Sequence, residues 1–303
     1  MKILVVLPQK TRWMAELERS LRLVADIQFI TLEAWTYGPN RDSSDGVKKL
    51  SDDLKALSRS FDYVIFNFEF FEELLEKFWI PIIQDIASTA GVIFWFFDSY
   101  RCRDLYLSVI KATAPACCFF ACYLDKMWFS SFYVNSFYVP LEGSYECYNS
   151  KSTTRGSGTG FIGSQDKMDR SSYFLAQAVC QRIQVPACEL TYTALADFIK
   201  SKELIVNFSQ VEEDYLGRVS RVLKGRVLET GLCGRLIVSD YCSELEELFH
   251  GLIPYFSNVD TLCDLLDNLL SDESELRNRT LEFGKICESH RPSIAMVNAL
   301  VKL

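Results

Sequence analysis

The sequence lacks the motifs on which several common enzyme classes depend. It has only two histidines, His250 and His290, and no Ser-His-Asp order, G-x-S-x-G elbow, Walker loop or G-x-G-x-x-G fingerprint. These absences argue against hydrolases with a catalytic triad, P-loop enzymes and dinucleotide-binding dehydrogenases. For both histidines we favour a surface or helix-end position over a catalytic role, which stays open.

Patterns for metal ions and disulfides are also missing. The 11 cysteines are odd in number and form no C-x-x-C pair. Cys117, Cys118 and Cys122 lie close in sequence but have no fourth ligand at zinc spacing. No D-x-D pair stands at the end of an expected strand. We therefore expect no metal, no cofactor and free thiols in a reducing, cytoplasmic compartment.

The charge balance and the hydrophobic runs exclude two further classes. The formal net charge is −8, and neither half of the chain is basic. Binding to nucleic acid through the phosphate backbone is therefore not expected. The apolar runs at 3–7, 91–97 and 115–124 are too short for a membrane span or a signal-peptide core, which predicts a protein without a transmembrane segment.

Apolar runs alternate with helical patterns along the whole chain of 303 residues. Fully apolar strands in such a series indicate parallel sheets covered on both faces, that is, an α/β fold. The polar segment 142–159 divides the series and is the expected linker between domains 1–150 and 151–303. Two doubly wound sheets imply ligand binding outside the carboxyl ends of the strands. We expect strands at 2–7, 27–32, 61–68, 92–98, 116–122, 136–139, 160–163, 187–190, 204–207, 236–238 and 252–256.

The most informative stretch is KGRVLETGLCGRLIVSD, residues 224–240. It predicts a helix, a left-handed turn at Gly234 and a buried strand. Glu229 is a carboxylate that can accept hydrogen bonds from a vicinal diol such as ribose. The nearby cations Lys224 and Arg226, with helix amides, suit a diphosphate. The alternative is a solvated charged helix with an ion pair between Arg226 and Glu229.

Other polar residues follow expected strands. Gly163 and Ser164 form a turn after one strand, where backbone amides could approach a phosphate, and Asn207 ends another strand. A plain turn is the alternative for the glycine-serine pair. Asp98 closes the strand at 92–98 and could act as a general base or cap the following helix.

The segment GRVLETGLCGRLIVSD, the later SELEELF and the step LEFGK with Gly284 resemble GT-B glycosyltransferases, most closely a CgeB-like group. The resemblance implies a GT-B fold of two Rossmann-like doubly wound domains that face a cleft. The N-terminal domain would be the acceptor side, the C-terminal domain would hold the donor, and the last helix would pack on the N-terminal domain.

The resemblance also implies an activity and roles for single residues. The chain would move a sugar from a nucleotide-diphosphate sugar to a glycan, lipid or protein acceptor without a metal. Glu229 would bind the ribose, the Gly163–Ser164 segment would border the donor, and Asp98 lies in a matching W-F-x-D segment. Many retaining relatives carry a second Glu where this chain has Arg221. A sugar-nucleotide epimerase and a non-catalytic binding module are the alternatives.

Overall fold

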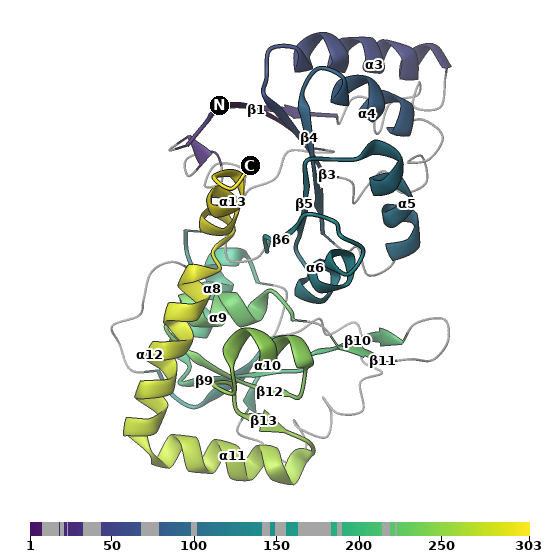
Figure 1. Cartoon of the computed structure of the whole chain (residues 1–303). Coiled ribbons are helices and arrows are strands. Elements are labelled where there is room, and N and C mark those ends of the chain that lie inside the picture. Colours follow the sequence, from purple (N-terminus) through teal and green to yellow (C-terminus); the bar gives the residue numbers. More distant parts are fainter. Residues whose placement is uncertain are drawn as a thin grey trace. The chain divides into compact units, whose positions relative to one another are not determined.

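The computed structural model divides the chain into two compact units, each with its own parallel sheet (Figure 1). Unit 1 comprises Met1–Leu141 and Pro292–Leu303, and unit 2 comprises Glu142–Arg291. The structure describes residues 1–7, 18, 21–22, 24–32, 44–67, 79–97, 102–140, 146–148, 156–162, 183–186, 190–213, 219–221 and 223–303.

Unit 1 contains a six-stranded parallel sheet with the order β2-β1-β3-β4-β5-β6. The expected strand at residues 2–7 is confirmed, and the others agree within a few residues. Pro81 lies in the first turn of its helix, where proline is tolerated because it lacks the N–H that later turns need. The elements are β1 Lys2–Leu7, β2 Asp26–Thr31, α3 Ser44–Ser58, β3 Tyr63–Asn67, α4 Ile80–Ala87, β4 Gly91–Phe96, α5 Arg103–Thr113, β5 Cys117–Phe120, α6 Tyr123–Ser130, β6 Ser136–Tyr138 and α13 Pro292–Leu300.

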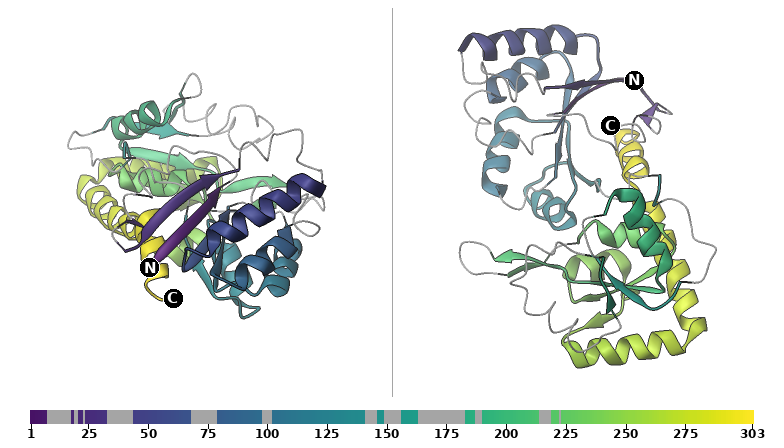
Figure 2. Two further views of the ribbon diagram at one scale, coloured as in Figure 1. Left: turned by 90° about the horizontal axis from the view of Figure 1, so that it is seen from above. Right: turned by 180° about the vertical axis from the view of Figure 1, so that it is seen from behind.

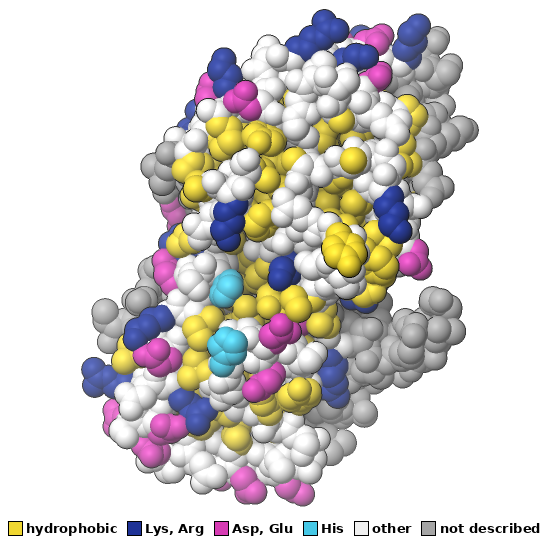
Figure 3. All heavy atoms as spheres, in the orientation of Figure 1, with side chains coloured by type: hydrophobic (Ala, Val, Ile, Leu, Met, Phe, Trp, Pro, Cys, Tyr) yellow, Lys and Arg dark blue, Asp and Glu magenta, His cyan; other side chains and the backbone are white. Residues whose placement is uncertain are grey.

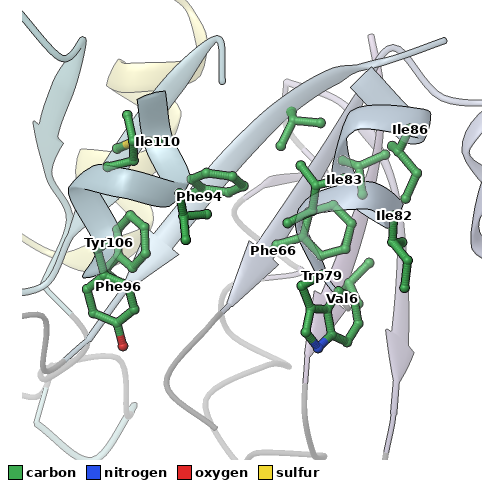
Figure 4. Close-up of a cluster of buried hydrophobic side chains, with 14 of the residues drawn as sticks. Val6, Phe66, Trp79, Ile82, Ile83, Ile86, Phe94, Phe96, Tyr106 and Ile110 are labelled. Atoms are coloured by element: carbon green, nitrogen blue, oxygen red, sulfur yellow. The ribbon is translucent and has the colours of Figure 1, made fainter. Parts of the chain in front are cut away.

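Both faces of this sheet are covered by helices (Figures 1 and 2). Helices α3 to α6 lie on one face and α13 lies on the other, against β6. Successive side chains of a strand point to opposite faces, so the even-numbered residues of β3 and β4 form the core beneath α4 and α5. Figure 4 shows Phe66 and Phe94 there, near Trp79, Ile83 and Ile110.

Unit 2 contains a five-stranded sheet with the order β13-β12-β9-β7-β8, also parallel throughout. A short antiparallel ribbon of β10 and β11, not predicted from the sequence, follows β9. Of the strand expected at 187–190, residues 187–189 lie outside the described residues and Leu190 is in no strand, while β8 precedes them at Ile183–Gln184. The elements are β7 Thr159–Phe161, β8 Ile183–Gln184, α8 Tyr192–Ser201, β9 Leu204–Asn207, β10 Gln210–Glu213, β11 Val219–Arg221, α9 Arg226–Leu232, β12 Leu236–Asp240, α10 Ser243–Phe249, β13 Tyr255–Phe256, α11 Val259–Ser271 and α12 Glu273–Ser289.

The expected linker 142–159 is not solvated along its whole length. Its residues 146–148 form a turn, and the Tyr148 side chain in that turn is fully buried. The Lys200 ammonium on α8 donates a hydrogen bond to the Cys147 carbonyl at 2.6 Å. Although the segment is polar in composition, the buried Tyr148 side chain attaches this turn to the rest of unit 2.

Nine described cysteines are free thiols, in agreement with the expectation from their spacing. Cys117 and Cys118 on β5 are part of the buried sheet. Burial raises the pKa of the Cys117 thiol to about 12, so it stays protonated at neutral pH. Cys180 and Cys188 lie outside the described residues. Within the described part of the chain, no helix is long and apolar enough to cross a bilayer.

Helices α9 and α12 pack closely together beside the sheet of unit 2. A Cβ atom on Gly231 would lie 2.3 Å from the Cys287 sulfur, and the Gly284 Cβ position is 3.4 Å from the Gly231 carbonyl oxygen. Phe283 and Cys287, which face Gly231, are fully buried. Only glycine at position 231 therefore permits this spacing between the two helices.

We expect Gly231→Ala to lower the free energy of unfolding by about 1–2 kcal/mol. The clash with Cys287 costs more than the improved helix propensity returns. Urea unfolding measures the change. Gly284→Ala is the matched control, because its added methyl group meets only an ordinary contact, and it should be neutral or slightly stabilising. Equal stability of the two variants would show that the α9–α12 contact is loose.

Candidate functional site

The stretch 224–240 folds as the sequence predicts. Helix α9 ends at Leu232, and Gly234 adopts a left-handed conformation with φ 72°. The Arg235 N–H donates to the Thr230 carbonyl at 3.1 Å, and the Gly234 N–H donates to the Gly231 carbonyl at 2.9 Å. These two bonds form a Schellman motif, which turns the chain directly into β12.

Glu229 lies on a buried helix, which argues against the solvated charged helix considered from the sequence. Every residue from Val227 to Leu232 is buried, and Glu229 is 8% exposed. Burial, the main cause, raises the pKa of Tyr148, and the negative charge of Glu229 raises it further. The Tyr148 phenol therefore stays neutral close to this carboxylate. A carboxylate at such a depth is costly to bury, which makes Glu229 a candidate functional residue.

Arg226 connects the start of α9 to the end of β7. Its Nη1 donates a hydrogen bond to the Ile162 carbonyl. Ile162 directly precedes Gly163 and Ser164, which lie outside the described residues. The hydrogen bond therefore joins the start of α9 to the residue just before Gly163, and the sequence analysis assigned both places to the nucleotide donor.

Asn207 lies at the carboxyl end of β9, fully buried. Its Nδ2 donates to the Ser239 hydroxyl on the neighbouring strand β12 at 2.8 Å. The Asn207 Oδ1 and the hydroxyl of the buried Ser209 have no hydrogen-bond partner in the described part of the chain. Neutral polar groups therefore collect at the edge of the sheet where ligands of this architecture bind.

Asp240 organises the same edge. One carboxylate oxygen accepts the Ser209 N–H at 2.6 Å, and the other pairs with the Arg221 guanidinium. Arg221 ends β11, so the ion pair attaches the β10–β11 ribbon to the end of β12. Arg221 is thus held by a carboxylate.

Glu244 is a further buried carboxylate of this region that the sequence analysis did not single out. It lies in the first turn of α10, has no exposed surface and accepts a hydrogen bond from the Leu223 N–H. Leu223 precedes Lys224, which is partly buried. Glu244 thus anchors the backbone that leads into α9. The segment SELEELF was its only signal, and an acidic surface helix gives the same pattern.

The remaining sequence expectations have mixed outcomes. Asp98 lies outside the described residues. His250 is an exposed residue with left-handed φ at the end of α10, as expected for a helix-end histidine. His290 caps α12, and burial lowers its pKa. Among the described residues, no group of three potential ligands is placed to hold a metal ion.

Neither a family model nor a curated protein matches the sequence. Solved structures do match over the full chain. Sucrose-phosphate synthase from Thermosynechococcus elongatus has a TM-score of 0.61 at 10% identity and covers 100% of this chain and 98% of its own. A trehalose-6-phosphate protein from E. coli bound with UDP-2-fluoro glucose has a TM-score of 0.61 at 8% identity, with coverage of 100% and 98%.

A UDP-N-acetylglucosamine 2-epimerase is also similar, with a TM-score of 0.54, 10% identity and coverage of 99% and 94%. Identities of this size show a shared fold only. The two parallel-sheet units and these likenesses place the chain in the GT-B fold class.

We expect the Arg221–Asp240 pair to hold the β10–β11 ribbon in place. In a double-mutant cycle of Arg221→Gln and Asp240→Asn, the coupling free energy should be about 0.5–1 kcal/mol, because both groups are partly exposed to solvent. Urea unfolding measures it. The i,i+3 pair of Lys285 and Glu282 on α12 is the control and should couple more weakly, since both its side chains are mostly exposed. A zero value for the Arg221 cycle would make the pair incidental.

Proposed function

We propose that the chain is a glycosyltransferase that moves a sugar from a nucleotide-diphosphate sugar to an acceptor hydroxyl. The observation that carries this proposal is the buried carboxylate of Glu229 on α9, a helix whose first residue, Arg226, bonds to the Ile162 carbonyl just after the carboxyl end of β7. In a doubly wound sheet, ligands bind at the carboxyl ends of the strands. The likeness to nucleotide-sugar enzymes of the same fold supports the choice of ligand.

Glu229 binds the ribose of the donor in this proposal. Its two carboxylate oxygens can accept hydrogen bonds from the two hydroxyls of the ribose. Because Glu229 is buried, each such bond is stronger than at the surface. The close packing at Gly231 fixes the helix and therefore the carboxylate.

Lys224 and Arg226 hold the diphosphate. A guanidinium carries five N–H donors, so Arg226 can bond to the Ile162 carbonyl and also contact a phosphate oxygen. Gly163 and Ser164 follow Ile162 directly and would border the same phosphates. The two cations would stabilise the charge that develops on the leaving diphosphate, which is the role a divalent metal fills in other transferases.

The chemical step needs a base on the acceptor. The acceptor hydroxyl attacks the anomeric carbon, the bond from that carbon to the diphosphate oxygen breaks, and the hydroxyl proton passes to the base. Asp98 is our candidate for this base, from its position after the apolar run of β4. The leaving diphosphate keeps the electron pair of the broken bond.

Two of the structural neighbours show which activities the test must separate. One neighbour is bound with UDP-2-fluoro glucose, and another is a UDP-N-acetylglucosamine 2-epimerase. A transferase consumes a nucleotide sugar only when an acceptor is present. An epimerase converts the donor alone, and a binding module converts nothing. A thermal-shift screen over nucleotide diphosphates identifies which nucleobase the donor carries. A ligand at about a hundred times its Kd adds about 2.7 kcal/mol of stability, which the screen detects.

We expect Glu229→Gln to weaken nucleotide binding roughly ten- to a hundredfold, because a charge-assisted hydrogen bond contributes about 1.5–3 kcal/mol. Isothermal titration calorimetry with the diphosphate from the screen measures this. Glu282→Gln, an exposed carboxylate on α12, is the control and should bind as tightly as the wild type. Unchanged affinity of a folded Glu229→Gln variant would place the donor elsewhere.

The two other roles separate in the same assay. Lys224→Ala should weaken the binding of the diphosphate more than that of the free nucleoside, since it touches only phosphate. Asp98→Asn should leave nucleotide affinity nearly unchanged and reduce kcat, because a general base acts on the acceptor. A loss of nucleotide affinity in Asp98→Asn would contradict its assignment to the acceptor.

A further inference from the structure

Helix α6 and the turn that follows it expose a group of large apolar side chains. Met127 is 38% exposed, Phe132 is 43% exposed and Tyr133 is 99% exposed. We call these three residues the α6 tip. Figure 3 shows hydrophobic side chains at the surface over α6. A cluster of this kind within seven consecutive residues needs an explanation that single exposed hydrophobic residues do not.

The α6 tip stands on a rigid base. Phe129 is fully buried and stacks on Phe120 with a centroid distance of 4.6 Å. The Phe132 N–H donates to the Phe129 carbonyl at 3.0 Å, and the Tyr133 N–H donates to the Ser130 carbonyl at 3.0 Å. The exposed rings therefore extend from an ordered turn.

Tyr133 occupies an unfavourable backbone conformation. Its φ is 62°, in the left-handed region that aromatic residues rarely adopt. Its ring is almost fully exposed, so packing within the described part of the chain does not offset the energetic cost of this conformation. An exposed aromatic side chain held at a strained position suggests a contact outside the chain.

Two lysines lie beside the α6 tip, Lys111 at the Phe132 ring and Lys126 at the Met127 sulfur, although the chain as a whole carries a net negative charge. The Lys111 ammonium lies 5.7 Å from the centre of the Phe132 ring, and the Lys126 ammonium lies 5.6 Å from that of Tyr123. The charge of Asp125 is balanced by Arg103, whose Nη2 is 2.6 Å from the carboxylate. The one exposed carboxylate of α5, Asp104, is in the first turn of that helix, whereas Lys111 is in its last turn.

We propose that the α6 tip docks on the surface of an anionic lipid bilayer. Aromatic rings favour the boundary between headgroups and acyl chains, and lysines beside them reach the lipid phosphates. Three apolar side chains bury much less area than the roughly 800 Å² that each partner contributes to a stable protein interface. Shallow insertion needs no more than such a tip, and local positive charge selects an anionic surface over a neutral one.

This proposal does not depend on the proposed function. Vesicle co-sedimentation tests it with phosphatidylcholine alone and with about 30% phosphatidylserine added. We expect the wild-type chain to sediment with the anionic vesicles at least tenfold more strongly than with the neutral ones. The binding should weaken as salt rises, because the attraction of the two lysines is screened.

The first variant, Phe132→Ser/Tyr133→Asn, removes both rings and should lower binding about tenfold or more. Asparagine tolerates the left-handed backbone of position 133, so this variant should fold as well as the wild type. Leu281→Ser on α12, with 55% exposure in the wild type, is the matched control and should leave binding unchanged.

The second variant, Lys111→Gln/Lys126→Gln, removes the cations and should lower binding to anionic vesicles by about fivefold per lysine. Lys285→Gln is its control. No binding to either vesicle, equal binding to both, or binding that the tip variants leave unchanged would overturn the proposal. The proposal would also be overturned if sedimentation velocity without lipid showed a wild-type dimer that the first variant abolishes. A second copy of the chain, not a bilayer, would then cover the α6 tip.

Discussion

The close approach of α9 to α12 at Gly231 is the constraint that fixes the position of the buried Glu229. No side chain at this position fits against Cys287, so the two helices meet through backbone. Glu229 lies two residues before Gly231 on a helix of only seven residues, which leaves it little freedom to rotate or slide. The Schellman motif at Gly234 fixes the other end of the helix to β12. One glycine contact and one glycine turn therefore orient the buried carboxylate.

The two sheets repeat one plan at the edge where ligands bind. In each, the first strand lies between the second and the third, which places a topological switch point beside the third strand. That third strand ends in asparagine in both sheets, Asn67 on β3 and Asn207 on β9. Both asparagines are buried, and each donates its Nδ2 to the next strand, to the Trp95 carbonyl and the Ser239 hydroxyl respectively.

The repeated asparagines explain how a polar edge follows an apolar strand. In both sheets the side-chain amide bonds to the neighbouring strand just where the core ends. The Oδ1 atoms of both residues lack a hydrogen-bond partner among the described residues. A buried amide oxygen without a hydrogen-bond partner lowers stability. The presence of such an asparagine at both switch points is therefore better explained by a role at the strand ends than by packing.

Much of this architecture follows from the sequence, because its hydrophobic periods are strong. The bounds expected for β1 and β9 match the structure. The hydrophobic pattern did not predict the very short elements. Strand β8 has two residues, and β10 has the polar sequence QVEE, so neither carries the apolar run by which strands were recognised.

The candidate site was harder to predict, because burial there contradicts residue type. Glu229 and Glu244 lie on segments rich in charge, which usually indicates a surface, yet both are buried. The burial of Tyr148 was not predicted, because the residue lies in a polar stretch whose composition is typical of a linker. Pairs such as Arg226 with the Ile162 carbonyl and Asp240 with Arg221 join residues far apart in the chain. No spacing rule within one sequence reports such contacts.

The ion pair of Arg221 and Asp240 bears on how the donor sugar is held. In the retaining relatives that the sequence resembles, the position of Arg221 carries a carboxylate. Here the residue is a cation whose charge Asp240 balances, so the pair presents no net charge to a ligand. The charged groups that contact the donor in our proposal are Glu229, Lys224 and Arg226. The neutral oxygens of Asn207 and Ser209 at the same sheet edge suit hydroxyl groups. Under the proposed function, this division would suit a donor whose charge resides in its diphosphate and whose sugar is uncharged.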